Sequence, residues 1–358
     1  MSTSSIDEIR LLAELVAIPS PSGSEAEVAS LVERTARRAG LDVRNDDLGV
    51  VVEVAGGSPG PTLALVSHLD TVPPGDGWSR DPWDPAIEDG RLYGRGSGDA
   101  KASVAAMLAA AADLAAAGVP VRGRVLVVLG RCEETRDTTM PGLVPRLGSV
   151  DAAVVGEPTN LDLATAQRGL LRLDLVARGT QIHAGRAGGG GFVNAIAVLA
   201  RDLIALADVG AGRPHAQLGD PTVTPTMIEG GVSRNVTPPL ARAALDVRTT
   251  PAWTHAELIR AVRDRVRSEV EVVSELLVPC ETPPGSRLVA AARAARPAAR
   301  EYGSPTCSDW VWFREIDAVK CGPGTSARSH TPDECVEVAE VREARAFYAA
   351  LARAWAGA

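Results

Sequence analysis

Cysteine, aromatic residues and clustered positive charge are all scarce in this sequence. The 358 residues include five cysteines, which are scattered and form no Cys-x-x-Cys pair. We therefore expect reduced thiols in a cytoplasmic protein, with neither a disulfide framework nor a thiolate zinc site. The net charge is -8, aromatic residues make up 3% of the chain, and no basic run occurs. This composition argues against a nucleic acid as partner.

The sequence also lacks a long hydrophobic stretch. The alanine-rich run from Ala102 to Ala117 contains Asp113 and falls short of the roughly 20 residues that a membrane-spanning helix needs. Residues Met1 to Arg10 show no basic segment followed by an apolar core, so we expect no export signal. These absences predict a cytoplasmic protein that does not associate with membranes.

The chain does contain alternating short apolar strands and helices, in a composition that is 45% apolar and 23% charged. This length and composition are typical of two globular domains. Near-continuous apolar runs predict strands buried on both faces of a mostly parallel sheet. A first helix is expected to start at the capping box Ser5-x-x-Glu8. The predicted strands cover residues 62–66, 124–130, 152–155 and 318–321, and the other predicted helices cover 25–38, 102–117, 286–300 and 339–355.

From about Gly169 the pattern changes to strict alternation. Leu171, Leu173 and Leu175 alternate with charged residues, and the same period of two recurs over residues 241–248. Such strands belong to an antiparallel sheet that has one covered face.

This change divides the chain into domains. We interpret residues 169–279 as an α+β domain inserted into a discontinuous α/β domain, which is formed by residues 1–168 and 280–358. A sheet with one exposed face often pairs with a copy of itself, so we expect a homodimer through the inserted domain.

Ser67-His68-Leu69-Asp70 follows the first buried strand and places a histidine and a carboxylate on the same side of an extended segment. One of them can bind a metal ion while the other accepts the second imidazole N–H and fixes the tautomer. By itself the pattern also fits an ordinary polar strand end.

Further acidic residues stand just past apolar strands, namely Asp99, Glu133, Glu134 and Glu157. Ligands of open α/β sheets bind at the carboxyl ends of the strands, so these carboxylates are expected to meet beside His68. Taken singly, Asp99 also fits a helix cap, and the glutamate pair also fits a solvated surface. The Gly-x-Gly-x-Gly turn before Asp99 is also compatible with a phosphate cradle, but the Asp99 carboxylate would repel phosphate.

Five motifs occur in one order: Ser67-His68-Leu69-Asp70-Thr71-Val72, Gly94-Arg95-Gly96-Ser97-Gly98-Asp99-Ala100-Lys101, Glu133-Glu134, Val155-Gly156-Glu157-Pro158-Thr159, and Gly322-Pro323-Gly324 with His330. Each is weak alone. Together, and over nearly the whole chain, they resemble the co-catalytic zinc amidohydrolases, a family that includes acetylornithine deacetylase, succinyl-diaminopimelate desuccinylase, aminoacylase and carboxypeptidase G.

The resemblance implies an α/β fold, in which a zinc-peptidase-like catalytic domain has a mixed central sheet flanked by helices. The inserted α+β domain would then serve as lid and dimerisation domain. The resemblance also implies two zinc ions per chain, with cobalt or manganese as substitutes. In the family pattern His68 and Glu157 would hold one ion, Glu134 and His330 the other, and Asp99 would bridge both.

The same resemblance assigns catalytic and substrate-binding residues. Glu133 would be the general base, and Asp70 would orient His68. His183 matches a histidine that reaches across the dimer to stabilise the tetrahedral oxyanion. Asn235 and Arg248 match positions that grip the oxygen and the α-carboxylate of the substrate. The alternatives are an exposed lid histidine for His183 and a salt bridge on the sheet face for Arg248.

The implied activity is hydrolysis of an amide bond that releases an acyl group, most plausibly acetyl, from the α-amine of an amino acid such as N-acetylornithine. Alternatives in the same class are a di- or tripeptidase, an N-succinyl-diaminopimelate desuccinylase, and a deacylase of a specialised amino-acid conjugate. From other classes, a non-catalytic binder of such conjugates and a thiol hydrolase using Cys132 or Cys307 stay open.

Overall fold

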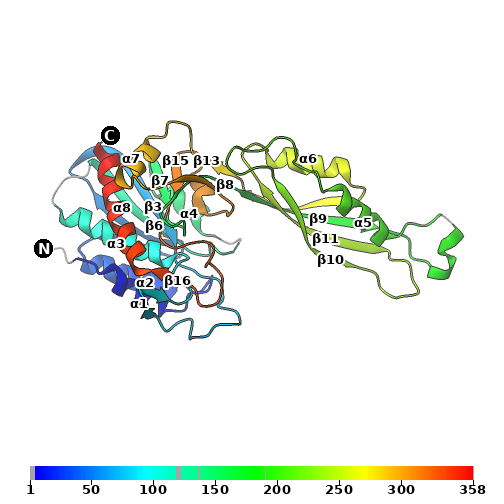
Figure 1. Cartoon of the computed structure of the whole chain (residues 1–358), viewed down its shortest axis with the longest axis horizontal. Coiled ribbons are helices and arrows are strands. Elements are labelled where there is room, and N and C mark those ends of the chain that lie inside the picture. Colours follow the sequence, from blue (N-terminus) through cyan, green and yellow to red (C-terminus); the bar gives the residue numbers. More distant parts are fainter. Residues whose placement is uncertain (1–4, 118–121, 136–137, 190, 358) are drawn as a thin grey trace. The chain divides into compact units, whose positions relative to one another are not determined.

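The computed structural model describes residues 5–117, 122–135, 138–189 and 191–357 (Figure 1). Contacts divide the chain into two units. The first comprises Met1–Thr165, Thr282–Tyr302 and Ser308–Ala358, and the second comprises Ala166–Glu281 with Gly303–Cys307. The assignment of catalysis to one unit, and of a lid and a dimer contact to the other, stays a prediction.

A nine-stranded mixed sheet forms the centre of the first unit. Strands β3, β6 and β7 are parallel neighbours, with Leu65 opposite Val127 on one side and Val154 on the other. Strand β2 runs antiparallel to β6. The order across the sheet is β1 (Asp42–Asp46), β2 (Gly49–Ala55), β6 (Arg122–Gly130), β3 (Ser58–His68), β7 (Ala152–Val155), β15 (Asp317–Lys320), β8 (Leu163–Gln167) and β13 (Cys280–Glu281), and β14 (Glu301–Ser304) pairs with β8.

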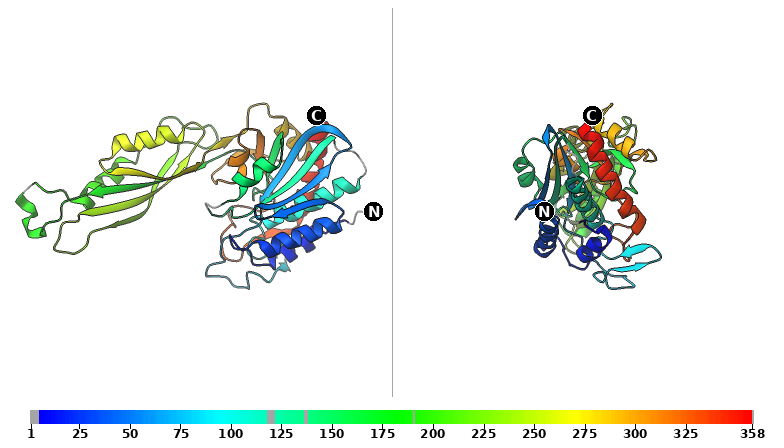
Figure 2. Two further views of the ribbon diagram at one scale, coloured as in Figure 1. Left: turned by 180° about the vertical axis from the view of Figure 1, so that it is seen from behind. Right: turned by 90° about the vertical axis from the view of Figure 1, so that its left-hand side faces the viewer.

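Strands from the start of the chain and from its last quarter therefore share one sheet (Figure 2). The five longer helices of this unit contribute to one hydrophobic core, together with alternate strand residues such as Leu63 and Leu65. They are α1 (Glu8–Val16), α2 (Ala26–Arg38), α3 (Lys101–Ala116), α7 (Arg287–Ala295) and α8 (Val338–Gly357). The predicted mixed sheet flanked by helices is thus confirmed.

Helix α3 shows how this core is packed. Almost all of its residues are buried, and it lies against both α1 and α8. Its many alanines suit this position, because small apolar side chains let helices approach closely and are favourable in a helix. None of the helices in the described part of the chain combines the length and hydrophobicity that crossing a bilayer requires.

Shorter elements complete the first unit. They are α4 (Met140–Leu143), the 3-10 helices η1 (Val144–Arg146) and η3 (Asp309–Phe313), and a small sheet of β4 (Ala86–Glu88), β5 (Arg91–Tyr93) and β16 (Cys335–Glu337). The predicted capping box at the first helix is wrong. Asp7 caps α1 instead, since its Oδ1 accepts the N–H groups of Ile9 at 3.0 Å and Arg10 at 3.1 Å.

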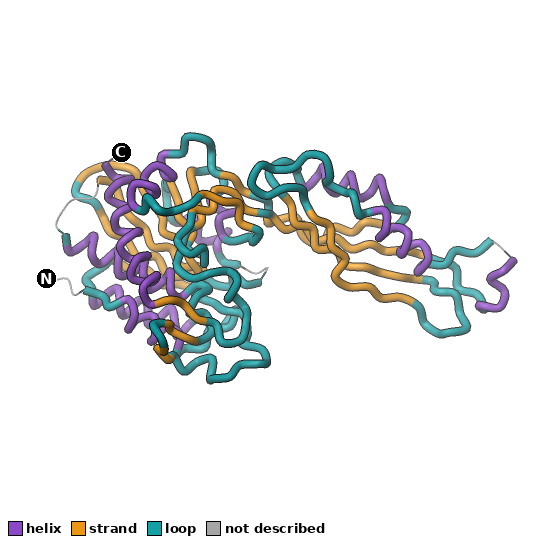
Figure 3. The backbone as a smooth tube through the Cα atoms, viewed as in Figure 1, coloured by secondary structure: helices purple, strands orange, loops and turns teal. Residues whose placement is uncertain are grey.

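The second unit is a four-stranded antiparallel sheet in the order β10 (Thr222–Gly230), β11 (Leu240–Thr249), β9 (Gly169–Arg178) and β12 (Glu269–Leu277). Helices α5 (Ala195–Ala205) and α6 (His255–Arg265) share a core with the alternate leucines of β9 (Figure 3). The burial of every second residue along β11 confirms the predicted period of two. A 3-10 helix, η2 (Ala184–Gly189), follows β9.

The parallel strands determine where the polar residues meet. Strand β3 ends at His68, β6 at Gly130 and β7 at Val155. Because these three strands are parallel neighbours, the segments that follow them leave the sheet at the same edge. That edge carries His68, the turn containing Glu133 and Glu134, and Glu157.

Candidate metal centre

His68 is buried at the end of β3, with 1% of its surface exposed. Its Nδ1 lies 3.0 Å from the carbonyl oxygen of Asp70 and 3.4 Å from the Asp70 carboxylate, so Nδ1 donates a proton to these oxygens. Its Nε2 lies 3.4 Å from Asp99 Oδ1 and 3.8 Å from Glu157 Oε1. In the described residues neither His68 Nε2 nor Glu157 Oε1 has a hydrogen-bond partner. Two buried ligand atoms therefore face each other, 3.8 Å apart.

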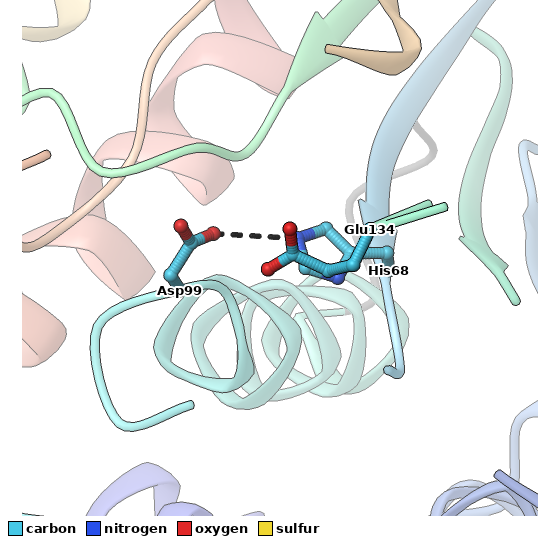
Figure 4. A group of neighbouring side chains, drawn as sticks. All are labelled: His68, Asp99 and Glu134. Atoms are coloured by element: carbon cyan, nitrogen blue, oxygen red, sulfur yellow. Dashed lines mark ion pairs between the residues drawn. The ribbon is translucent and has the colours of Figure 1, made fainter. Parts of the chain in front are cut away.

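Asp99 follows the glycine turn after β5, and the peptide bond between Asp99 and Ala100 is cis. One carboxylate oxygen faces His68, and the other lies 3.6 Å from His330 Nε2. Figure 4 shows the Asp99 carboxylate directed at the His68 ring, with Glu134 beside them. Ligand atoms of His68, Asp99 and Glu134 all lie within 4.8 Å of one another. The Asp99 carboxylate thus stands between the two histidines, and it is not the cap of α3, a position that Ala100 occupies.

Glu134 and His330 form the second half of the cluster. His330 comes from the loop between β15 and β16, adopts a left-handed backbone conformation with a φ of 63°, and leaves 51% of its side chain exposed. Its Nε2 lies 2.9 Å from Glu134 Oε1. The structure therefore brings together all five residues for which the sequence predicts metal binding, namely His68, Asp99, Glu134, Glu157 and His330.

The glutamate pair lies in a turn after β6. Asp70 fixes this turn, because its Oδ1 accepts the N–H of Glu133 at 3.0 Å and its Oδ2 accepts the N–H of Glu134 at 3.0 Å. The hydroxyl of Ser22 donates to the same Oδ2 at 2.6 Å. Asp70 thus positions the glutamate pair in addition to His68.

Glu25 is a supporting residue that sequence reasoning missed. Its buried carboxylate accepts the N–H of Gly23 at 2.8 Å, the N–H of Cys132 at 3.2 Å and the thiol of Cys132 at 3.4 Å. Cys132 has a φ of 57°, so this contact holds a left-handed residue directly before Glu133. Burial and the charge of Glu25 raise the pKa of the Cys132 thiol to about 11. A thiol so hard to ionise is a poor nucleophile, which argues against a thiol hydrolase at Cys132.

The cluster carries more negative than positive charge. Burial and the charge of Glu157 raise the pKa of Glu133 well above its usual range, while burial and the charge of Asp99 raise the pKa of Glu157 to about 8. Burial alone would lower the pKa of His68, but the neighbouring carboxylates of Asp70 and Asp99 raise it well above the usual value. A divalent cation beside these carboxylates would favour their ionised form, and oxygen and imidazole donors suit zinc, cobalt and manganese.

The three other predicted site residues belong to the second unit. His183 is exposed after β9, and its Nδ1 accepts the N–H of Gly185 at 3.1 Å, so the ring proton is on Nε2. The N–H of Ala184 donates to the carbonyl oxygen of Asn235 at 2.8 Å, which places His183 and Asn235 side by side. Arg248 donates to both carboxylate oxygens of Asp246, at 2.8 and 3.2 Å. This is the salt bridge that the sequence left open as the alternative.

Comparison with known proteins places these features in a family context. Residues 64–354 match the model of "Peptidase family M20/M25/M40". The chain is 33% identical to a succinyl-diaminopimelate desuccinylase of Cereibacter sphaeroides, over 96% of this chain and 97% of that protein. Among solved structures, a tripeptidase of Staphylococcus aureus matches with a TM-score of 0.81 at 20% identity, covering 99% of this chain and 100% of that one. A dinuclear metal-binding peptidase of the M20 family from Bacillus subtilis matches with a TM-score of 0.73 at 18% identity, covering 97% and 96%.

We predict that Asp70→Asn weakens binding of divalent metal about tenfold to a hundredfold, because an amide N–H₂ would face one of the two N–H donors of the glutamate turn. A Co²⁺ titration in a chelator-buffered solution measures this. Asp151→Asn is the matched control, since Asp151 accepts the N–H of Thr62 at 2.7 Å near the other end of β3. We expect the control to bind metal as the unchanged protein does. Wild-type affinity in Asp70→Asn would contradict the positioning role.

Proposed function

The chain is a member of peptidase family M20/M25/M40, as its motifs predict, and we propose that it releases an acyl group from the amine of an amino acid by hydrolysing the amide bond between them. Its membership and its curated relatives make it a metal-dependent hydrolase of the amidohydrolase type. The observation that supports the proposal best is the pair of unpartnered buried atoms, His68 Nε2 and Glu157 Oε1, beside the carboxylates of Asp99 and Glu133.

We propose that two zinc ions, replaceable by cobalt or manganese, occupy this centre. His68 and Glu157 would hold one ion, Glu134 and His330 the other, and Asp99 would bridge them. Three ligand carboxylates and a shared hydroxide carry four negative charges, which equals the charge of two Zn²⁺ ions. When bound, the ions would polarise the scissile carbonyl and lower the pKa of the attacking water.

Glu133 would then act as the general base. It takes a proton from the attacking water and later delivers it to the nitrogen of the leaving amine. The carboxylate of its neighbour Glu134 lies 2.9 Å from His330 Nε2, whereas burial and the charge of Glu157 raise the pKa of Glu133, which favours a role in carrying a proton. The two glutamates thus have separate tasks, one binding metal and one moving protons.

We further propose a homodimer formed through the second unit. Strand β10 is an edge strand, whose unpaired backbone groups can continue a sheet into another chain. Large apolar side chains are exposed along it and on the adjacent helix α5, including Met227 at 73% and Ile204 at 78%. Ile196, Ile228 and Val232 extend the same surface. Burying this surface against a second copy would remove it from water.

The geometry of the second unit supports action across that dimer. His183 and Asn235 lie before the start of β11, and Arg248 lies near its end. From Leu240 to Arg248 the strand spans about 27 Å, at roughly 3.4 Å per residue. This length exceeds that of an N-acyl amino acid, so one substrate cannot contact both ends of the same copy. We propose that His183 and Asn235 serve the site of the partner subunit. Arg248 would bind the α-carboxylate of the substrate. Its guanidinium would then donate to both this carboxylate and Asp246.

The acyl group is the open part of the proposal. The sequence analysis favours acetyl as the acyl group, as in an N-acetylornithine deacetylase. The curated relatives named succinyl-diaminopimelate desuccinylase favour the succinyl alternative, at 33% and 30% identity. Succinyl carries a methylene and a carboxylate that acetyl lacks, so a direct comparison of substrates separates them. Di- and tripeptides and specialised amino-acid conjugates are further candidates. The five free thiols fit the proposed cytoplasmic location.

We predict that Glu133→Ala keeps both metal ions but lowers kcat by about 10²- to 10⁴-fold, because the proton carrier is lost. Metal content by mass spectrometry and initial rates measure the two effects. Turnover near the wild-type rate would contradict the assignment of Glu133 as the general base.

A mixing experiment tests action in trans. Neither His183→Ala nor Glu133→Ala should be active alone, but a mixed dimer would contain one intact site. Random pairing of equal amounts should therefore restore about a quarter of the wild-type activity. Mass spectrometry of the intact dimers shows whether mixing has occurred. Mixed dimers without activity would place His183 in its own chain's site.

Amine release from a panel of substrates tests the class and the acyl group together. The panel contains N-acetyl amino acids, N-succinyl-diaminopimelate and simple dipeptides, with a chelated control. We expect hydrolysis of one N-acyl amino acid and its loss on chelation. Activity that survives chelation would favour a thiol hydrolase using Cys307. Two bound metals without activity on any panel member would leave a specialised conjugate or a non-catalytic binder.

A further inference from the structure

Glu334 is a buried acid for which the proposed reaction has no use. It is 1% exposed and comes from the loop that also carries His330. Its Oε1 accepts the N–H groups of Gly98 at 2.9 Å and Asp99 at 3.0 Å. Its Oε2 accepts the N–H of Gly96 at 3.1 Å and an N–H of Arg95 at 2.6 Å. Four donors from five consecutive residues thus surround one carboxylate.

The glycine turn is shaped around this carboxylate. Gly96 has a φ of 81°, and a Cβ at this position would lie 2.6 Å from the Thr71 side chain, so only glycine fits. The N–H groups on either side of Ser97 converge as they do in anion-binding loops. Sequence reasoning considered a phosphate for this turn. The structure instead fills it with an acid from the same chain, 235 residues further along.

Arg95 compensates the charge of Glu334. Its side chain is 1% exposed, its second N–H₂ group donates to the carbonyl oxygen of Pro74 at 3.1 Å, and its guanidinium lies 5.1 Å above the Trp78 ring. A buried ion pair with these additional hydrogen bonds has a fixed geometry, and removing one partner leaves an uncompensated charge. The pair is therefore a rigid support for the turn.

This support also fixes the loop that carries His330. The N–H of Gly94 donates to the carbonyl oxygen of Glu334 at 2.9 Å, and β16 then pairs with β5, with Cys335 opposite Tyr93. His330 lies four residues before Glu334, and its Nε2 is 3.6 Å from Asp99 Oδ2. Glu334 thus connects the backbones on which these two side chains stand.

We propose that Glu334, paired with Arg95, is a positioning residue for metal binding, which holds the Asp99 peptide so that the Asp99 carboxylate stays between His68 and His330. This inference rests on the proposed metal site. It predicts that changes at Glu334 act on metal affinity although Glu334 binds no metal itself. Residues that support metal ligands commonly change affinity or activity by a factor of about 10 to 100.

The test compares Glu334→Gln with Asp202→Asn. Asp202 is an equally buried acid in the second unit, which accepts the N–H groups of Arg267 at 3.0 Å and Ser268 at 2.8 Å. Both substitutions turn a buried carboxylate with backbone donors into an amide, so both should lower the Tm of the metal-free protein. Only Glu334→Gln should raise the Kd for Co²⁺, by about 10- to 100-fold in a chelator-buffered titration. Excess Co²⁺ should restore kcat without a change in KM.

Glu334→Asp covers the case in which the Gln variant does not fold. It keeps the charge but, being one methylene shorter, cannot reach all four donors, so its Kd should lie above the wild-type value. Wild-type Kd in a folded Gln or Asp variant would overturn the positioning role and leave the proposed function intact. A wild-type chain that binds no Co²⁺ would overturn the proposed function and this inference with it.

Discussion

The carboxylate of Asp70 holds together the segments that form the candidate metal centre. It accepts hydrogen bonds from the hydroxyl of Ser22, from the N–H groups of Glu133 and Glu134, and faces the Nδ1 of His68. Burial alone would raise the pKa of Asp70, but its contacts with His68 and Ser22 hold that pKa below the ordinary value. An ionised Asp70 can therefore fix the His68 tautomer and the glutamate turn at the same time. Without this carboxylate, no shared acceptor would hold the end of β3 and the turn after β6 together.

The acids around the centre fall into two groups that differ in how their charge is compensated. Asp70, Glu25 and Glu334 each accept several N–H or O–H donors, although burial and the charge of Asp99 still raise the pKa of Glu334. In the described residues Glu157 Oε1 has no hydrogen-bond partner, and burial raises the pKa values of both Glu133 and Glu157. This difference in hydrogen-bond donors separates the acids that fix the backbone of the site from the acids whose carboxylates are available to a cation or a proton. The second group is the one that metal and substrate chemistry would use.

This division also explains how much the sequence could predict. His68, Glu134 and Glu157 follow buried strands of the central sheet within a few residues, so local patterns place them at one edge of that sheet. The partners of Glu25 and Glu334 are 107 and 235 residues away, and no periodic pattern marks a hydrogen bond of that range. The glycine turn before Asp99 did carry a signal, because converging N–H groups require an anion. Sequence reasoning excluded phosphate correctly but could not tell which acid of the chain takes its place.

The missed strands have a similar cause. Strands β10 and β12 form the two edges of the antiparallel sheet, and most of their residues are exposed. Register shifts interrupt both strands, between Pro225 and Met227 in β10 and after Val272 in β12, so alternation of apolar and polar residues does not extend far enough to predict a strand. The position of the first helix cap was missed for another reason. Ser5 and Asp7 both fit the cap preference, and only the backbone geometry decides between them.

The two halves of the candidate centre differ in burial, and this difference determines how each can be held. His68 ends a central strand and is 1% exposed, so the packing of the sheet fixes it. His330 stands on a loop with 51% of its side chain exposed, so packing contributes much less to its position. Hydrogen bonds therefore have to fix the loop of His330. The Ser79 hydroxyl donates to Asp333 at 2.8 Å, and N–H groups of the glycine turn donate to Glu334. A half held in this way can stay exposed and still present a defined ligand, because these hydrogen bonds hold neighbouring residues of the loop and do not involve the exposed ring of His330.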